Sequence, residues 1–162
     1  MAFLTLHLTG SAIPDHQVSI LGALTLSAIF LVGAIGEELR WSGFALDPLQ
    51  GRWSCLAAAV FTGAIWAVWH YPALVQTHRS VAWIAWWTLG SIALRVIMVW
   101  LYNGTRGSVV AAAVFHAVSN LCRQLFPIRG SWFDPRLHGL LMTAVACVVA
   151  VGILKQARKS RV

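Results

Sequence analysis

Two glutamates at the end of an apolar stretch are the first residues of this sequence that could do chemistry. Glu37 and Glu38 follow the uncharged residues 18–35 without a turn signal, so one helix would carry both carboxylates to its end. Because neighbouring residues of a helix point about 100 degrees apart, the two side chains cannot aim at one point. One can act as a general base while the other serves as an anchor. These two residues alone fit a solvated pair at a helix end equally well.

Two histidines and an asparagine supply groups that carboxylates lack. His70 comes four residues after Trp66, and Asn120 comes four residues after His116, so each pair shares one helix face. An imidazole stacked above an amide can donate two hydrogen bonds to a developing oxyanion, as acyl transfer requires. The structural alternatives are a satisfied interfacial histidine at position 70 and an interhelical hydrogen-bonding pair at positions 116 and 120.

Together these residues indicate an enclosed hydrolytic site built from three apolar segments. They provide a base, a second imidazole and a pair of hydrogen-bond donors. The sequence contains neither GxSxG nor HExxH, so serine and zincin mechanisms lack their signatures. Glu37, His70 and His116 are also ordinary zinc ligands, and the residues leave open whether the site holds a divalent metal such as zinc or none.

Arg95 is a further polar residue that needs an explanation. It lies in the middle of residues 81–102, with no acidic residue within a turn of its own helix. A charge at that depth costs about 3 kcal/mol on insertion scales, so such residues usually face a bundle interior. Arg95 is expected either to neutralise a glutamate across the bundle or to extend toward the membrane surface.

The composition places all of these residues in a membrane protein. Of the 162 residues, 59% are hydrophobic and 10% are charged, and the mean hydropathy is +0.73. A spanning helix needs about 20 mostly apolar residues. Such stretches fill most of the chain, at residues 18–35, 53–70, 81–102, 107–121 and 137–154. The second is expected to end before Pro72, because the residue before a proline avoids helical geometry. We predict an all-α fold, a polytopic membrane helix bundle of about five transmembrane helices.

The rest of the chain bounds the domain organisation. We expect a short amino-terminal segment at residues 1–17, one membrane-embedded domain at residues 18–154 and a basic tail at residues 155–162. Basic residues gather only in that tail, which is typical of a cytoplasmic membrane flank. The expected partner is therefore the lipid bilayer, and no nucleic acid is expected. Three widely spaced cysteines support neither a disulfide framework nor a zinc ribbon.

Three motifs in the same order resemble those of a known family. Its first motif is a Glu-Glu pair, three residues and an arginine, and is resembled by GEELRWSGFALDPLQGRW. The second, an aromatic residue, three residues and a histidine, matches Trp66 to His70; the third, a histidine, three residues and an asparagine, matches His116 to Asn120. From about residue 35 to residue 121 the chain is similar to the CPBP group of membrane proteases, also called the CAAX prenyl endopeptidase type 2 or Abi family.

The resemblance implies a multi-helix membrane protease. In it Glu37 would activate the attacking water, Glu38 and His70 would support it, and His116 with Asn120 would stabilise the oxyanion. We therefore expect an intramembrane endopeptidase of a bacterial-type plasma membrane that cleaves membrane-associated proteins or peptides, prenylated CAAX-type substrates among them. The family leaves zinc-dependent and metal-free glutamate mechanisms open. The chain is short for the family, as expected if amino-terminal helices are missing.

One departure from the family motif supports an alternative function. The family's arginine would fall at Ser42, whereas here it is Arg40, so the partner of the carboxylates is expected to differ. The main alternative is a noncatalytic membrane immunity or scaffolding protein of the same fold. A small transporter or channel would use the glutamates and Arg95 as an ion path, but no inverted repeat is visible. The sequence decides neither the substrate nor the oligomeric state.

Overall fold

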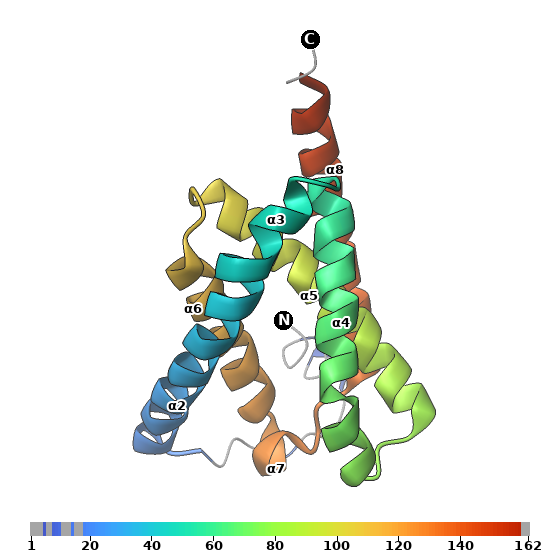
Figure 1. Cartoon of the computed structure of the whole chain (residues 1–162). Coiled ribbons are helices and arrows are strands. Elements are labelled where there is room, and N and C mark those ends of the chain that lie inside the picture. Colours follow the sequence, from blue (N-terminus) through green and yellow to red (C-terminus); the bar gives the residue numbers. More distant parts are fainter. Residues whose placement is uncertain (1–4, 6–7, 11–13, 15–17, 160–162) are drawn as a thin grey trace.

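Helices make up the regular structure of this chain (Figure 1). The computed structural model describes residue 5, residues 8–10, residue 14 and residues 18–159, and no strand occurs in them. In order, the elements are α2 (Ile20–Glu38), the π-helix η1 (Leu39–Leu46), α3 (Asp47–Gln50), α4 (Cys55–Gln76), α5 (Val81–Gly104), α6 (Val109–Gln124), α7 (Pro127–Gly130) and α8 (Pro135–Lys159). The predicted all-α fold is confirmed.

Four helical stretches are long and apolar enough to cross a membrane, among the residues that the structure describes. They are Ile20–Gln50, Cys55–Gln76, Val81–Gly104 and Pro135–Leu154. The first joins α2, η1 and α3 into one continuous stretch. The fifth predicted segment, residues 107–121, forms α6, which has 16 residues and is therefore shorter than the roughly 20 that a spanning helix needs.

A serine begins each of the four helices α2, α4, α5 and α6. Its side-chain oxygen accepts a hydrogen bond from the backbone N–H three residues later, which satisfies one of the free donors of the first turn. These capping residues are Ser19, Ser54, Ser80 and Ser108. The sequence thus marks where each of these four helices begins, and the position of each polar residue along its helix is counted from that start.

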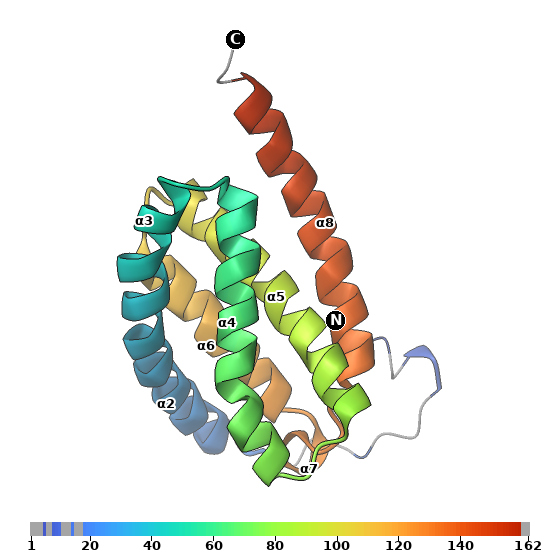
Figure 2. The same cartoon turned by 45° about the vertical axis from the view of Figure 1, so that its right-hand side comes forward.

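Helix α5 lies at the centre of the bundle and packs against α4, α6 and α8. Its middle is the most buried part of the chain, from Ala93 to Val99. A glycine permits the closest approach of α4, because a Cβ at Gly63 would lie 3.0 Å from both Arg95 Cβ and Ile92 Cα. Helix α2 packs on the other side of α6, and the carboxyl-terminal half of α8 extends beyond the other helices (Figures 1 and 2).

One expected helix end is wrong, and a second helical stretch also continues past a proline. Helix α4 continues to Gln76 with Pro72 inside it, and the stretch that begins with α2 continues past Asp47 and Pro48 to Gln50. A proline inside a helix removes one hydrogen bond, a loss that neighbouring groups can offset in a membrane helix. Pro48 lies at the junction of η1 and α3 inside the same continuous stretch, and it likewise donates no backbone hydrogen bond.

The two ends of the chain lie largely outside what the structure describes. Most of the predicted amino-terminal segment, residues 1–17, is outside the described residues. The helix α8 passes through the expected boundary at residue 154 as far as Lys159. The side chains of the predicted basic tail, residues 155–162, are outside the described part as well.

Candidate active site

The carboxylate of Glu38 is the point where four elements meet. Its side chain is fully buried, with 0% exposed, at the end of α2. Oε2 accepts hydrogen bonds from Arg95 Nη1 at 2.8 Å and from the Ser42 hydroxyl, and Oε1 accepts one from His116 Nδ1 at 3.0 Å. These donors come from α5, η1 and α6. Three donors to a buried carboxylate meet the requirement that a charge taken out of water be paired and hydrogen-bonded.

The π-helix places one of these donors. In η1 the backbone hydrogen bonds skip one residue more than in an α-helix, which widens the turn, and such segments are frequent at functional sites. Ser42 follows Glu38 by four residues and points back at its carboxylate. Ser42 is 1% exposed, so the bond lies in the protein interior.

Arg95 crosses the bundle to reach Glu38, which is the first of the two alternatives that the sequence left open. Only 1% of its surface is exposed. Its guanidinium carbon lies 5.1 Å from the centroid of the Trp66 ring, within the range of a cation–π contact. In the described part of the chain, its Nε and Nη2 are buried without a hydrogen-bond partner. Glu38 therefore supplies the charge that compensates this arginine.

Glu37 has a different environment from its neighbour. Its side chain is half-buried and accepts one hydrogen bond, from Trp66 Nε1 to Oε2 at 2.8 Å. It lines a cavity of about 280 Å³ together with Arg40, Trp41 and Trp69, which we call the glutamate cavity. Within the described residues Arg40 forms no ion pair. Oε1 of Glu37 is left free to accept a proton from a molecule in this cavity.

Trp66 links the two glutamates to the histidines. Besides its bond to Glu37, its ring makes edge contacts with His70 at 5.0 Å and with His116 at 5.2 Å between ring centroids. The Trp66 carbonyl oxygen accepts a hydrogen bond from His70 Nδ1 at 2.8 Å. Because Nδ1 is the donor in that bond, Nε2 of a neutral His70 carries a free lone pair.

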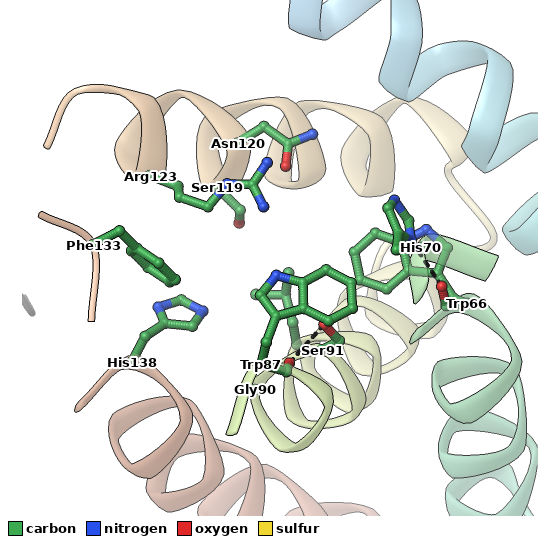
Figure 3. Close-up of a pocket in the computed structure, with 11 residues that line it drawn as sticks. Trp66, His70, Trp87, Gly90, Ser91, Ser119, Asn120, Arg123, Phe133 and His138 are labelled. Carbon is green, nitrogen blue, oxygen red and sulfur yellow. Dashed lines mark hydrogen bonds between the residues drawn. The ribbon is translucent and has the colours of Figure 1, made fainter. Parts of the chain in front are cut away.

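A second cavity, of about 100 Å³, is lined by residues from α4, α5, α6 and α8. We call it the polar cavity; Trp66, His70, Ser91, Ser119, Asn120, Arg123 and His138 contribute to its wall. Figure 3 shows Asn120 and Arg123 on α6 facing Trp87 and Ser91 on α5. The Asn120 amide makes no hydrogen bond in the described part of the chain, so its donors are available to a molecule in the cavity.

The five predicted site residues therefore lie in three neighbouring places rather than in one. His116 is joined directly to Glu38, and both are buried. His70 and Asn120 line the polar cavity, whereas Glu37 lines the glutamate cavity. Trp66 links these places, since it lines the polar cavity, donates to Glu37 and contacts the ring of His116. Within the described residues no hydrogen bond joins Glu37 to either histidine, or His116 to Asn120.

The three candidate metal ligands do not form a metal site in this arrangement. Across the described residues, no three side chains of histidine, cysteine, aspartate or glutamate are grouped as metal ligands would be. Nδ1 of His116 is bonded to Glu38, Nδ1 of His70 is bonded to a carbonyl oxygen, and Glu37 faces a separate cavity.

The sequence reasoning did not single out Arg123 or His138, which both line the polar cavity. Arg123 follows Asn120 by three residues and His116 by seven, so helical periodicity alone puts it on their face. His138 comes from α8 and has no local pattern that ties it to the others. The motif comparison places the family's arginine at Ser42, but it does not predict that the Ser42 hydroxyl donates a hydrogen bond to Glu38.

A comparison with protein families bears on this site. Residues 19–122, which are more than half of the chain, match the model described as type II CAAX prenyl endopeptidase Rce1-like. The chain belongs to this family. All five predicted site residues lie inside the matched range, which begins just before α2 and ends within α6. The family and its apolar helices make the chain an integral membrane protein.

A curated relative agrees with the Rce1-like assignment over most of the chain. CAAX prenyl protease 2 of Methanococcus maripaludis is 28% identical over 165 residues, which cover 93% of this chain. The chain spans 58% of the length of that relative. The range of the family model, residues 19–122, includes every residue that lines the glutamate cavity. It also includes those that line the polar cavity, except Arg123, Phe133 and His138.

Proposed function

We propose that this Rce1-like chain is an intramembrane endopeptidase that hydrolyses peptide bonds of membrane-associated substrates with a glutamate-activated water. The family supports a protease, and the relative's name supports a prenylated CAAX-type protein or peptide as the substrate. Its expected place is a bacterial-type plasma membrane. The noncatalytic alternative has lost its main argument, because Arg95 compensates Glu38 without an arginine at position 42.

The contrast between the two glutamates carries the proposal. Glu38 is fully buried and saturated by three donors, so it cannot take a proton from a water molecule. Glu37 is half-buried at a cavity, with one donor that fixes its orientation and one oxygen free. A general base must be within hydrogen-bond reach of the proton that it takes. Glu37 meets that condition and Glu38 does not.

In this proposal each of the site residues has a role in one step of hydrolysis. Glu37 takes a proton from water, the hydroxide adds to the scissile carbonyl carbon, and Glu37 returns the proton to the leaving amine as the C–N bond breaks. The Asn120 amide donates to the oxyanion from the wall of the polar cavity. His116, held through Nδ1 by Glu38, adds a second N–H when its imidazole is protonated. The lone pair of His70 Nε2 orients the water.

Attack requires the two cavities to connect at Trp66. The proposed base and the proposed amide donor face different cavities, and Trp66 lines the polar cavity while it donates a hydrogen bond to Glu37. The Trp66 side chain thus connects the polar cavity, where the substrate carbonyl would lie, with Glu37. Trp66 is therefore a positioning residue in this proposal.

An apolar cavity beside the site supports a lipidated substrate. It has a volume of about 450 Å³, lies between α5, α6 and α8, and is lined chiefly by Leu, Ile, Val, Phe and Met side chains. It shares Leu94, Ser119, Arg123, Phe133 and His138 with the polar cavity. A hydrocarbon chain can enter this cavity from the bilayer without a large change in hydrophobic free energy, because lipid tails and the cavity walls are similarly apolar, and close packing would hold it there. A peptide whose lipid lies in the apolar cavity can reach the polar cavity directly.

The Glu37→Gln variant tests the proposal. Purified chain in liposomes is expected to cleave a prenylated CAAX peptide, and Glu37→Gln is expected to lower kcat by about 100-fold or more, since a positioned base contributes about 10²–10⁴-fold. Asp47→Asn is the matched control, because it makes the same acid-to-amide change outside both cavities and keeps an acceptor for Tyr102. Full cleavage by Glu37→Gln would overturn the assignment of the base, and the absence of cleavage by the unmodified chain would overturn the activity.

A further inference from the structure

The glutamate cavity contains one cation and one anion that do not pair with each other. Arg40 follows Glu37 by three residues, so the two side chains share one face of the helical stretch, and both line the cavity. The Arg40 side chain is exposed, and in the described part of the chain it forms an ion pair neither with Glu37 nor with another residue. The cavity therefore presents two separate and opposite charges to a ligand.

These two charges lie at the level of the lipid headgroups. Ile20–Gln50 is one helical stretch of 31 residues, longer than the roughly 20 residues that cross the hydrocarbon core. Because α2 begins at Ile20, about 20 residues of this stretch reach the opposite membrane surface, which places Glu37 and Arg40 close to that surface. Trp41 and Trp69 line the same cavity, and tryptophan is typical of the membrane interface.

The cavity opens toward the bilayer. Its wall comes from α2, η1 and α4, and Figure 1 shows α2 and α4 apart, while α2 packs mainly on α6. A Cβ at Gly33 or Gly36, which both line the cavity, would have no neighbour from another helix within 4 Å. On the α4 side 67% of Trp69 is exposed. A lipid headgroup can therefore enter the cavity from the side while its chains stay in the bilayer.

We infer that the glutamate cavity binds the headgroup of a lipid that carries a phosphate and a primary amine, with the phosphate on Arg40 and the amine on Glu37. The planar guanidinium can donate two parallel hydrogen bonds to phosphate oxygens. Glu37 accepts the Trp66 hydrogen bond through Oε2, so Oε1 is free to accept one from the ammonium group. Glu37 and Arg40 are about 4.5 Å apart along the helix axis, which suits a headgroup whose phosphate and amine are joined by a short ethylene link.

The charge balance of the cavity selects this class of headgroup. An anionic headgroup without an amine would be attracted by Arg40 but repelled by Glu37. A quaternary ammonium group has no N–H to donate to Glu37 Oε1, and only the aromatic rings of Trp41 and Trp69 would favour it. A headgroup on Oε1 also keeps water away from Glu37, so the lipid competes with hydrolysis; this consequence rests on the proposed function.

Native mass spectrometry of the purified full chain tests the binding. Micelles contain equal amounts of phosphatidylethanolamine, phosphatidylcholine and phosphatidylglycerol, and the unmodified chain is expected to retain the first about 10-fold more strongly than the others. Arg40→Gln should weaken retention of phosphatidylethanolamine and of phosphatidylglycerol, and Arg40→Lys should restore part of both. Glu37→Gln should weaken retention of phosphatidylethanolamine but strengthen that of phosphatidylglycerol, because the repelling charge is gone. A misfolded variant would not give such opposite changes.

Controls separate this site from general attraction at the membrane surface. Arg52→Gln removes an exposed arginine that lies outside the cavity, and it should keep the preference of the unmodified chain. Glycerophosphoethanolamine should displace the retained lipid better than inorganic phosphate does. Equal retention of the three lipids, a preference that survives Arg40→Gln, an equal loss in Arg52→Gln, or equal displacement by inorganic phosphate would each overturn the site.

Cleavage kinetics test the competition separately. When phosphatidylethanolamine replaces part of the phosphatidylcholine in liposomes, the KM of the unmodified chain for a prenylated peptide should rise while kcat stays the same, and Arg40→Gln should show no such rise over its own KM without phosphatidylethanolamine. A KM that does not respond, or a rise that persists in Arg40→Gln, overturns the competition. If the unmodified chain cleaves nothing but retains the lipids as expected, the lipid site stands and only the proposed function fails.

Discussion

At the scale of single residues, the buried pair of Glu38 and Arg95 sets the strongest energetic constraint. Each is at most 1% exposed, and removal of one partner leaves an uncompensated charge in the interior. We expect Arg95→Met to lower the free energy of unfolding by about 3–5 kcal/mol. Chemical unfolding in detergent micelles measures this change.

The cause of that loss can be separated from lost packing. In the double variant Glu38→Gln with Arg95→Met the carboxylate charge is gone, so the stability is expected to recover by more than half. Activity is not expected to recover, because His116 loses the carboxylate that holds its Nδ1. A double variant as unstable as Arg95→Met alone would show that packing, and not charge, is responsible.

Trp66 offers a second test at this scale, since its ring and its N–H have separate contacts. Trp66→Phe keeps an aromatic ring against His70 and His116 but removes the one hydrogen bond that the described residues donate to the Glu37 carboxylate. We expect kcat to fall about 10-fold, as loss of an orienting bond to a catalytic group gives, with KM little changed. The exposed Trp100→Phe is the matched control. An unchanged kcat in Trp66→Phe would mean that Glu37 needs no such orientation.

At the scale of elements, the close contact between α4 and α5 determines where Arg95 lies in the site. A Cβ at Gly63 would lie 3.0 Å from Arg95 Cβ and from the backbone of Ile92. Gly63→Ala must therefore displace α5, and overpacking of this kind costs about 1–3 kcal/mol. We expect lower thermal stability together with lower cleavage activity. Gly152→Ala, on α8 with open space around it, should leave both unchanged.

The sequence predicted the helical class and most of the long helices, but not all of their ends. Apolar stretches predict the helices, and the i, i+4 pairs predict which polar residues share a face. The bond from Arg95 to Glu38 joins residues 57 apart, and no local pattern encodes the choice between that partner and the membrane surface. The continuation of α4 through Pro72 depends equally on the surrounding bundle, because a proline normally favours a helix end.

At the scale of the whole molecule, polar and apolar side chains are distributed as a lipid solvent requires. Glu38, Arg95 and His116 are buried, whereas Ile29 and Val32 on α2 are more than half exposed. In water such a surface would be unfavourable, but lipid tails are as apolar as these side chains. The cavities therefore provide the polar surroundings that hydrolysis needs inside a protein whose outer surface faces hydrocarbon.

Cysteine labelling tests this orientation of the molecule toward lipid. Cys147 is exposed and lies within the membrane-spanning part of α8, so its thiol is expected to face hydrocarbon. Only a thiolate reacts quickly, and hydrocarbon disfavours that charge. Both proteins compared carry Cys55→Ser and Cys122→Ser, so each has a single cysteine. One keeps Cys147, and the other carries Arg52→Cys and Cys147→Ser, which places its cysteine in the exposed turn before α4. In liposomes, a water-soluble maleimide should label Cys147 at least about 10-fold more slowly than it labels the cysteine at position 52. Equal rates in intact liposomes would place Cys147 in water and would contradict an arrangement in which α8 spans the membrane.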